Sequence, residues 1–241
     1  MRAMLLFTLL VLSCSAAARS NDRVASAVHQ LDPTAVIDVS KPSPIPGLTL
    51  VSVRGQTLLV SKDGRYVIQG ELFDLKGHRD ISEDVRSAQR AAAIDTIPVS
   101  DRILFAARDP KYTVVMFFDP ECAFCRQMMG NIAQYQEQGI SVAVVAYPRN
   151  GLNSTAFARA DAIWCSPDRR EALIEALSHP ITAPKSCATI IRHQFEVGQA
   201  LSVPGTPTLM DEHGHYLGGY LTPGQLLDRL RSGPGTPGAG S

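Results

Sequence analysis

The sequence lacks an excess of charge of either sign and lacks a hydrophobic run long enough to cross a bilayer. Lys and Arg together number 23, and so do Asp and Glu, so no basic field exists for phosphate backbones. We therefore expect no nucleic-acid partner. The 241 residues are 45% hydrophobic and 19% charged, which excludes disordered, collagenous and heptad-repeat classes and allows one or two compact domains.

The first 18 residues have the pattern of a secretory signal peptide. Arg2 precedes the apolar run 4–12, and small residues follow to Ala18, where we expect cleavage. The apolar run is about half the roughly 20 residues that a spanning helix needs, so we expect an exported protein. Residues 11–14 loosely resemble a lipoprotein cleavage box, but Leu12 fits it poorly, so a lipid anchor on Cys14 is the less favoured alternative.

Four cysteines follow the signal, namely Cys122, Cys125, Cys165 and Cys187. In an oxidising compartment they allow three disulfide connectivities, and the local C-x-x-C of residues 122–125 favours the Cys165–Cys187 pairing. The alternative is a zinc site, which usually needs a second C-x-x-C or an H-x-x-x-H at matching spacing. The sequence has neither, so we expect no metal and no cofactor.

Residues 19–81 predict a small antiparallel domain after a short helical stretch and a Pro-rich turn. Its strands are expected at 48–54, 56–61 and 66–75, with a hairpin turn at 62–65 where Asp-Gly tolerates positive φ. A domain of this size buries little apolar surface, so pairing with a second copy through an open sheet edge would stabilise it. The sequence therefore predicts a homodimer.

Residues 82–100 predict a helical linker. Ser82 and the acidic residues after it resemble a helix start, and Pro98 stops the helix after Ile97. The apolar stripe of this helix is thin, which fits a bridge between two domains.

Residues 101–231 predict an α/β domain, and residues 232–241 a disordered Gly/Pro-rich tail. Continuous apolar runs at 112–118 and 140–147 flank a helix that begins at the C-x-x-C, which forms a βαβ unit. Later elements are a helical insertion, a hairpin and a last helix, at 154–200, 208–220 and from 222. The whole chain is thus expected to be α+β.

The C-x-x-C stands at the N-terminus of a helix, directly after a buried strand. Free backbone N–H groups and the helix dipole stabilise a thiolate there, so we expect Cys122 to be exposed, with a lowered pKa. Cys125 lies one turn inside the helix and would resolve a mixed disulfide. A purely structural bridge is the alternative, but so small a ring would stabilise little.

Thr206-Pro207, just before the next strand, predicts a substrate-facing loop. A cis bond is cheap only before proline, and beside a strand edge it leaves backbone groups free to pair with an extended peptide. An ordinary trans turn is the alternative, and only the C-x-x-C upstream favours cis.

These motifs resemble the DsbC-type periplasmic disulfide isomerases of the thioredoxin-fold superfamily. The resemblance covers nearly the whole mature chain, including residues 66–70, 117–125, 146–149, 162–165 and 205–207. It implies that Cys122 is the nucleophile, Cys125 its partner, and Thr206 and Pro207 the substrate loop. It also implies a structural Cys165–Cys187 disulfide and a dimer interface at Gly70.

The resemblance further implies a homodimer with chaperone-like binding of misfolded, disulfide-containing exported proteins. A DsbD-type membrane reductant would keep the active pair reduced, because only a free thiolate can start reshuffling. Ala123-Phe124 stands where the best-known member has Gly-Tyr, which leaves the balance of isomerase and oxidase open. The alternatives are an oxidase or reductase of the same fold, and a holdase chaperone with an incidental C-x-x-C.

Overall fold

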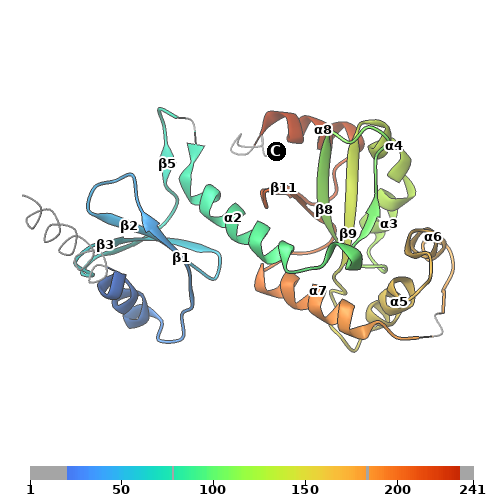
Figure 1. The fold of residues 1–241 in the computed structure, drawn as a ribbon, viewed down its shortest axis with the longest axis horizontal. Helices are drawn as coiled ribbons and strands as arrows, with labels where there is room; N and C mark the ends of the chain where they lie inside the picture. Colours follow the sequence, from blue (N-terminus) through green and yellow to red (C-terminus); the bar gives the residue numbers. More distant parts are fainter. Residues whose placement is uncertain (1–20, 78, 183–184, 234–241) are drawn as a thin grey trace, which may run out of the picture. The chain divides into compact units, whose positions relative to one another are not determined.

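Residues 21–77, 79–182 and 185–233 are described by a computed structural model. They form two compact units, and the boundary between Gln89 and Arg90 falls inside one helix (Figure 1). The predicted signal 1–18, with Cys14, lies outside the described residues, and so does the predicted tail except for residues 232 and 233. The predicted domain bounds stay a prediction.

The N-terminal unit is a four-stranded antiparallel sheet in the order β1-β2-β3-β4, with a helix over residues 21–31. One face of the sheet, including Val51 and Val60, packs on Val24 and Val28 of that helix. The opposite face packs on Val85. The strand bounds are Ile37–Pro42 for β1, Leu48–Val53 for β2, Gln56–Ser61 for β3 and Val67–Gln69 for β4.

This unit differs from the expectation in two places. Strand β1, which the sequence did not predict, precedes the Pro-rich turn and tolerates Pro42 because it forms a sheet edge. The strand expected at 66–75 is interrupted, because Leu72 donates its N–H to Ser82 Oγ at 2.8 Å and accepts from Ile81 N–H at 2.9 Å. The chain then continues into a separate hairpin of β5 (Phe73–Asp74) and β6 (Arg79–Asp80).

Helix α2 (Ile81–Asp95) begins one residue before the expected N-cap, Ser82. Asp80 takes the capping role, since its carboxylate accepts the N–H of Glu83 at 3.0 Å. Ser82 is buried and binds Leu72 instead. The short 3-10 helix η1 (Val99–Asp101) follows the Pro98 that ends this segment.

The C-terminal unit contains a five-stranded sheet in the order β11-β10-β8-β9-β7. Its centre is the predicted βαβ unit, in which β8 (Tyr112–Phe118) and β9 (Ile140–Ala146) run parallel. Every residue of β9 is buried, which explains why it reads as a continuous apolar run. The remaining strands are antiparallel to their neighbours: β7 (Ile103–Phe105), β10 (Thr208–Asp211) and β11 (Tyr216–Gly218).

Alternate residues of the central strands supply two hydrophobic clusters, one on each face of this sheet. Met116 and Val144 face the larger cluster, which includes Tyr135, Ile163 and Leu226. Phe117 and Val145 face the smaller cluster, which includes Ile97 and Val197. The sheet therefore lies between two hydrophobic layers, to which helices contribute residues such as Leu226 and Val197.

The helix after the C-x-x-C is split in two. We expected one helix, but α3 (Ala123–Gly130) ends at Asn131 and α4 (Ile132–Glu137) begins after it. Met128 and Tyr135 are buried, whereas Ile132 is only partly buried. Gly139 follows α4 with φ of +80°, a conformation that favours glycine.

The predicted insertion is confirmed as α5 (Thr155–Trp164), α6 (Arg169–Glu175) and α7 (Ala188–Ala200). The last helix, α8 (Pro223–Ser232), begins with a capping box between Thr222 and Gln225. These elements confirm the predicted α+β class. None of the helices in the described ranges is long and apolar enough to span a membrane.

Candidate active site

Cys122 lies where strand β8 passes into helix α3. The buried strand ends at Phe118, and residues 119–121 carry the chain to the N-cap position of α3, which Cys122 occupies. The backbone N–H of Cys125 points at the Cys122 sulfur from 3.5 Å. Both cysteines are free thiols in this structure. The free amide groups at the start of a helix favour a thiolate at this place.

The loop before β10 meets Cys122 from a distant part of the chain. Its Thr206–Pro207 bond is cis, as the sequence predicts. The Sγ–H of Cys122 donates to the carbonyl oxygen of Thr206 at 3.0 Å. The structure thus brings together the predicted cysteines and the predicted substrate loop.

The pKa values of the two thiols are shifted in opposite directions. A hydrogen bond from the Cys125 thiol is the largest cause that lowers the pKa of Cys122, to about 5. Burial opposes this shift, and the Thr206 side chain and the positive charge of Arg149 add to it. Burial raises the pKa of Cys125 far above that of an ordinary thiol. At neutral pH the pair therefore holds one thiolate, on Cys122, and one thiol, on Cys125.

The predicted exposure of Cys122 was wrong, because only 3% of this residue is accessible. The carbonyl of Thr206 covers the sulfur, and this contact joins residues 84 positions apart, which helix-start reasoning alone does not include. A thiolate has no proton to donate to that carbonyl. Ionisation therefore removes the hydrogen bond that holds the sulfur against the loop.

An ion pair between the buried carboxylate of Asp119 and the exposed side chain of Arg149 supports the segment before Cys122, and the predictions from sequence did not include it. The carboxylate of Asp119 accepts the N–H of Glu121 at 2.7 Å. It also accepts two hydrogen bonds from Arg149, from the backbone N–H and from Nε, both at 3.0 Å. Asp119 directly follows β8, and Arg149 lies just beyond the end of the parallel strand β9. The carboxyl ends of neighbouring parallel strands lie at the same edge of a sheet. The positions of Asp119 and Arg149, each just after one of the two apolar runs, could therefore have indicated this ion pair.

Comparison with known proteins finds a separate family match for the N-terminal part and for the C-terminal part of the chain. Residues 15–83 match the family model "Disulfide bond isomerase protein N-terminal domain", and residues 101–233 match "Thioredoxin-like domain". The thiol:disulfide interchange protein DsbC of Haemophilus influenzae is 30% identical over 80% of this chain and 82% of its own length. The chain belongs to the DsbC family. The protein is therefore an enzyme of thiol:disulfide interchange.

Other relatives extend this match over nearly the whole chain. DsbC of Dickeya dadantii is 29% identical over 95% of this chain and 94% of its own length. A solved structure, "Crystal structure of disulfide interchange protein from Neisseria gonorrhoeae", shares 26% identity with a TM-score of 0.48, covering 56% of this chain and 96% of that one.

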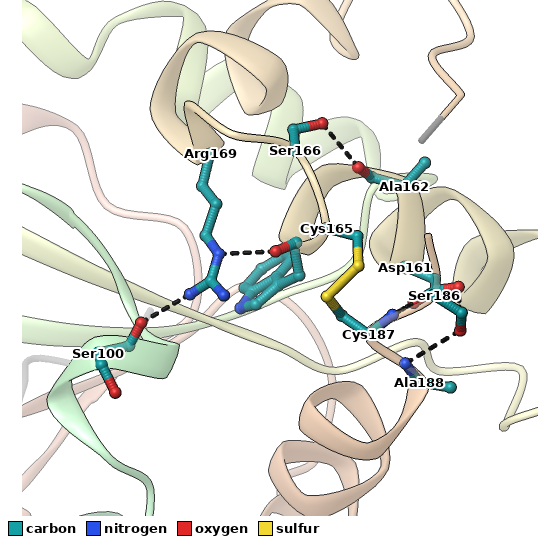
Figure 2. Close-up of a disulfide and its surroundings, with 10 residues drawn as sticks. Ser100, Asp161, Ala162, Cys165, Ser166, Arg169, Ser186, Cys187 and Ala188 are labelled. Atoms are coloured by element: carbon teal, nitrogen blue, oxygen red, sulfur yellow. Dashed lines mark hydrogen bonds between the residues drawn. A yellow bond between two sulfur atoms is a disulfide. The ribbon is translucent and has the colours of Figure 1, made fainter. Parts of the chain in front are cut away.

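The other two cysteines of this DsbC-family chain form a disulfide (Figure 2). Cys165 ends α5 and Cys187 precedes α7. The carboxylate of Asp161 accepts the backbone N–H of Cys187 at 2.6 Å and the hydroxyl of Ser186 at 2.8 Å. The bridge thus ties together two helices of the insertion.

Gly70 belongs to the N-terminal unit and directly follows β4. It is exposed, and a Cβ built there would meet nothing within 4 Å. No group of three or more His, Cys, Asp or Glu side chains within the described ranges is arranged to hold a metal ion.

Proposed function

We propose that the Cys122 thiolate starts the isomerisation of wrongly paired disulfides. The thiolate attacks one sulfur of a substrate disulfide, so that a bond forms between Cys122 and that sulfur while the substrate S–S bond breaks. The second substrate sulfur leaves as a thiolate. The observation that carries this proposal is the lowered pKa of Cys122 beside the buried Cys125 thiol.

Two routes can then resolve the mixed disulfide and release the substrate. Another substrate thiolate attacks the substrate sulfur, which forms a new substrate disulfide and returns Cys122 as a thiolate, with no net oxidation. Otherwise Cys125 loses its proton and attacks Cys122, which leaves the substrate reduced and the enzyme oxidised. A membrane thiol donor of the DsbD type would then reduce the Cys122–Cys125 disulfide.

The substrates in this proposal are misfolded proteins with wrong disulfides, exported to the periplasm as this protein would be by the signal at 1–18. Thr206 and Pro207 would hold them, because the loop covers the Cys122 sulfur and stands beside β10. An extended peptide pairing with this loop would replace the Thr206 contact with Cys122.

The proposed enzyme is a homodimer joined by its N-terminal sheets. Strand β4 forms one edge of that sheet, and its residue Ile68, together with Tyr66 just before it, is exposed although apolar. An open edge with apolar side chains is suited to pairing with another strand. Gly70 directly follows β4, at the end of the same edge.

Refolding of a scrambled multi-disulfide protein tests the function. The reduced wild-type protein should restore native disulfides, and Cys122→Ala should not. Cys125→Ser should accumulate mixed disulfides through Cys122, and identifying these adducts names the substrates. Reshuffling only by the oxidised protein would indicate an oxidase. Full rescue by Cys122→Ala would mean that the cysteine pair is incidental, as in a holdase.

A further inference from the structure

An exposed aromatic side chain stands between the two active cysteines. Phe124 belongs to the first turn of α3 and is 57% accessible, whereas Cys122 and Cys125 beside it are buried. Its ring centroid lies 5.7 Å from that of Tyr220, and the ring planes are tilted by 33°. The two rings therefore form one apolar surface beside the reactive sulfur.

The core of the domain fixes Tyr220 in this place. The next residue, Leu221, accepts a hydrogen bond from the hydroxyl of Tyr135 at 2.6 Å, and Tyr135 is fully buried. The preceding residue, Gly219, lies against the substrate loop, because a Cβ built on it would be 3.5 Å from the carbonyl oxygen of Pro207. The turn between β11 and α8 thus joins the loop of Thr206 and Pro207 to the ring of Phe124.

We propose that Phe124 and Tyr220 form a specificity site for an apolar substrate side chain two residues away from the cysteine that Cys122 attacks. This inference depends on the proposed function. A peptide that pairs with the Thr206–Pro207 loop in an extended conformation points alternate side chains toward the enzyme. When the substrate cysteine faces Cys122, the residues two positions away face the same side.

The residue spacing of an extended substrate peptide matches the spacing between Cys122 and Phe124. Cα atoms two residues apart in a strand are separated by about 6.5 Å, and those of Cys122 and Phe124 in a helical turn by about 5.5 Å. The rings of Phe124 and Tyr220 therefore lie within reach of a side chain two residues before or after the substrate cysteine that Cys122 attacks. An aromatic or long aliphatic side chain there would cover the exposed face of Phe124 and remove apolar surface from water.

Tyr216 offers a matched control. It is 47% accessible and also belongs to the hairpin before α8. It pairs with Met210, which lies three residues beyond Pro207 along β10 and therefore about 10 Å from it. Replacing Tyr216 removes an exposed ring of the same hairpin while leaving the ring pair beside Cys122 intact.

Reduced protein is mixed with two model peptides, each a mixed disulfide of glutathione with one cysteine. One peptide carries Phe two residues from the cysteine on both sides, and the other carries Ser there. We expect the wild-type protein to react about three- to tenfold faster with the Phe peptide, the size expected for one aromatic contact. Phe124→Ser and Tyr220→Ser should each bring this ratio toward one, Phe124→Leu should keep most of it, and Tyr216→Ser should keep all of it.

A wild-type ratio near one overturns the specificity site, and so does a ratio that Phe124→Ser and Tyr220→Ser leave unchanged. An equal fall in rate for both peptides overturns it too, because that result would mean a changed Cys122 and no apolar preference. Failure of the wild-type protein to react with either peptide would instead contradict the proposed nucleophile.

Discussion

The Cys122 thiol donates to the carbonyl oxygen of Thr206 at 3.0 Å, and this hydrogen bond can exist only while the sulfur is protonated. Other groups favour the ionised form so strongly that the pKa of Cys122 falls to about 5 in the folded protein, against 9.0 for an ordinary cysteine. At neutral pH the folded protein therefore carries a thiolate on Cys122, which cannot make this hydrogen bond.

The lowered pKa of Cys122 predicts how the stability of the reduced protein changes with pH. Between pH 5 and 9 the unfolded chain keeps a proton on Cys122 that the folded chain has lost, so the free energy of unfolding rises with pH across this window. The stabilisation is lost as the pH falls to about 5. Above pH 9 the raised pKa of Cys125 acts in the opposite direction.

Urea unfolding of reduced wild-type protein and of Cys122→Ser, at several pH values between 5 and 9, isolates this contribution. The difference in unfolding free energy between the two proteins should grow as the pH rises. The oxidised protein, in which Cys122 does not titrate, is the control. A difference that stays constant across the window would mean that folding does not change the pKa of Cys122.

Arg149 is expected to tune the same sulfur, because its positive charge lowers the pKa of Cys122 while its Nε binds Asp119. Arg149→Met should raise the pH at which Cys122 is half alkylated, by less than about one unit, because the charge of Arg149 is the smallest of the causes that lower this pKa. Arg149→Lys should restore most of the shift, since the charge returns without the paired geometry.

Arg108→Met is the charge-matched control for this experiment. Arg108 is exposed and precedes β8, whose seven residues place it about 20 Å from the end that leads to Cys122. Its removal should leave the alkylation midpoint unchanged. An equal shift in both variants would point to a change in net charge, and no shift in Arg149→Met would remove Arg149 from the site.

The sequence predicted those parts of the fold that depend on local patterns. Strands β8 and β9 are buried at almost every position, so they read as apolar runs of strand length. Thr222 and Pro223 carry the start signal of α8 in adjacent positions. The C-x-x-C after β8 located Cys122 at a helix start for the same reason.

What the sequence could not predict depends on distant contacts. The burial of Cys122 comes from Thr206, and the capture of Asp119 by Arg149 comes from two strand ends that only the folded sheet brings together. Leu72 leaves its expected strand because Ser82 takes its N–H group. In each case the arrangement depends on tertiary hydrogen bonds that no local sequence pattern encodes.

Gly70 gives a direct test of the proposed dimer. Because a Cβ at this position meets nothing within 4 Å, Gly70→Trp should leave the isolated N-terminal unit undisturbed. It should block pairing through β4, and sedimentation velocity should then show a monomer. Ser40→Trp, an exposed position on β1 at the opposite edge of the same sheet, should stay dimeric. A dimeric Gly70→Trp would move the interface away from β4.

The Cys165–Cys187 bridge is expected to stabilise the protein without taking part in exchange. It joins residues 22 apart, and closing a loop of that length stabilises a protein by about 3 kcal/mol through the unfolded chain. Replacing both cysteines by Ala should lower the free energy of unfolding by about that amount, measured by urea denaturation. The pH midpoint of Cys122 alkylation should stay where it is. Unchanged stability together with lost isomerisation would make this pair a second redox centre, because a bridge that supports only the fold cannot be removed without weakening it.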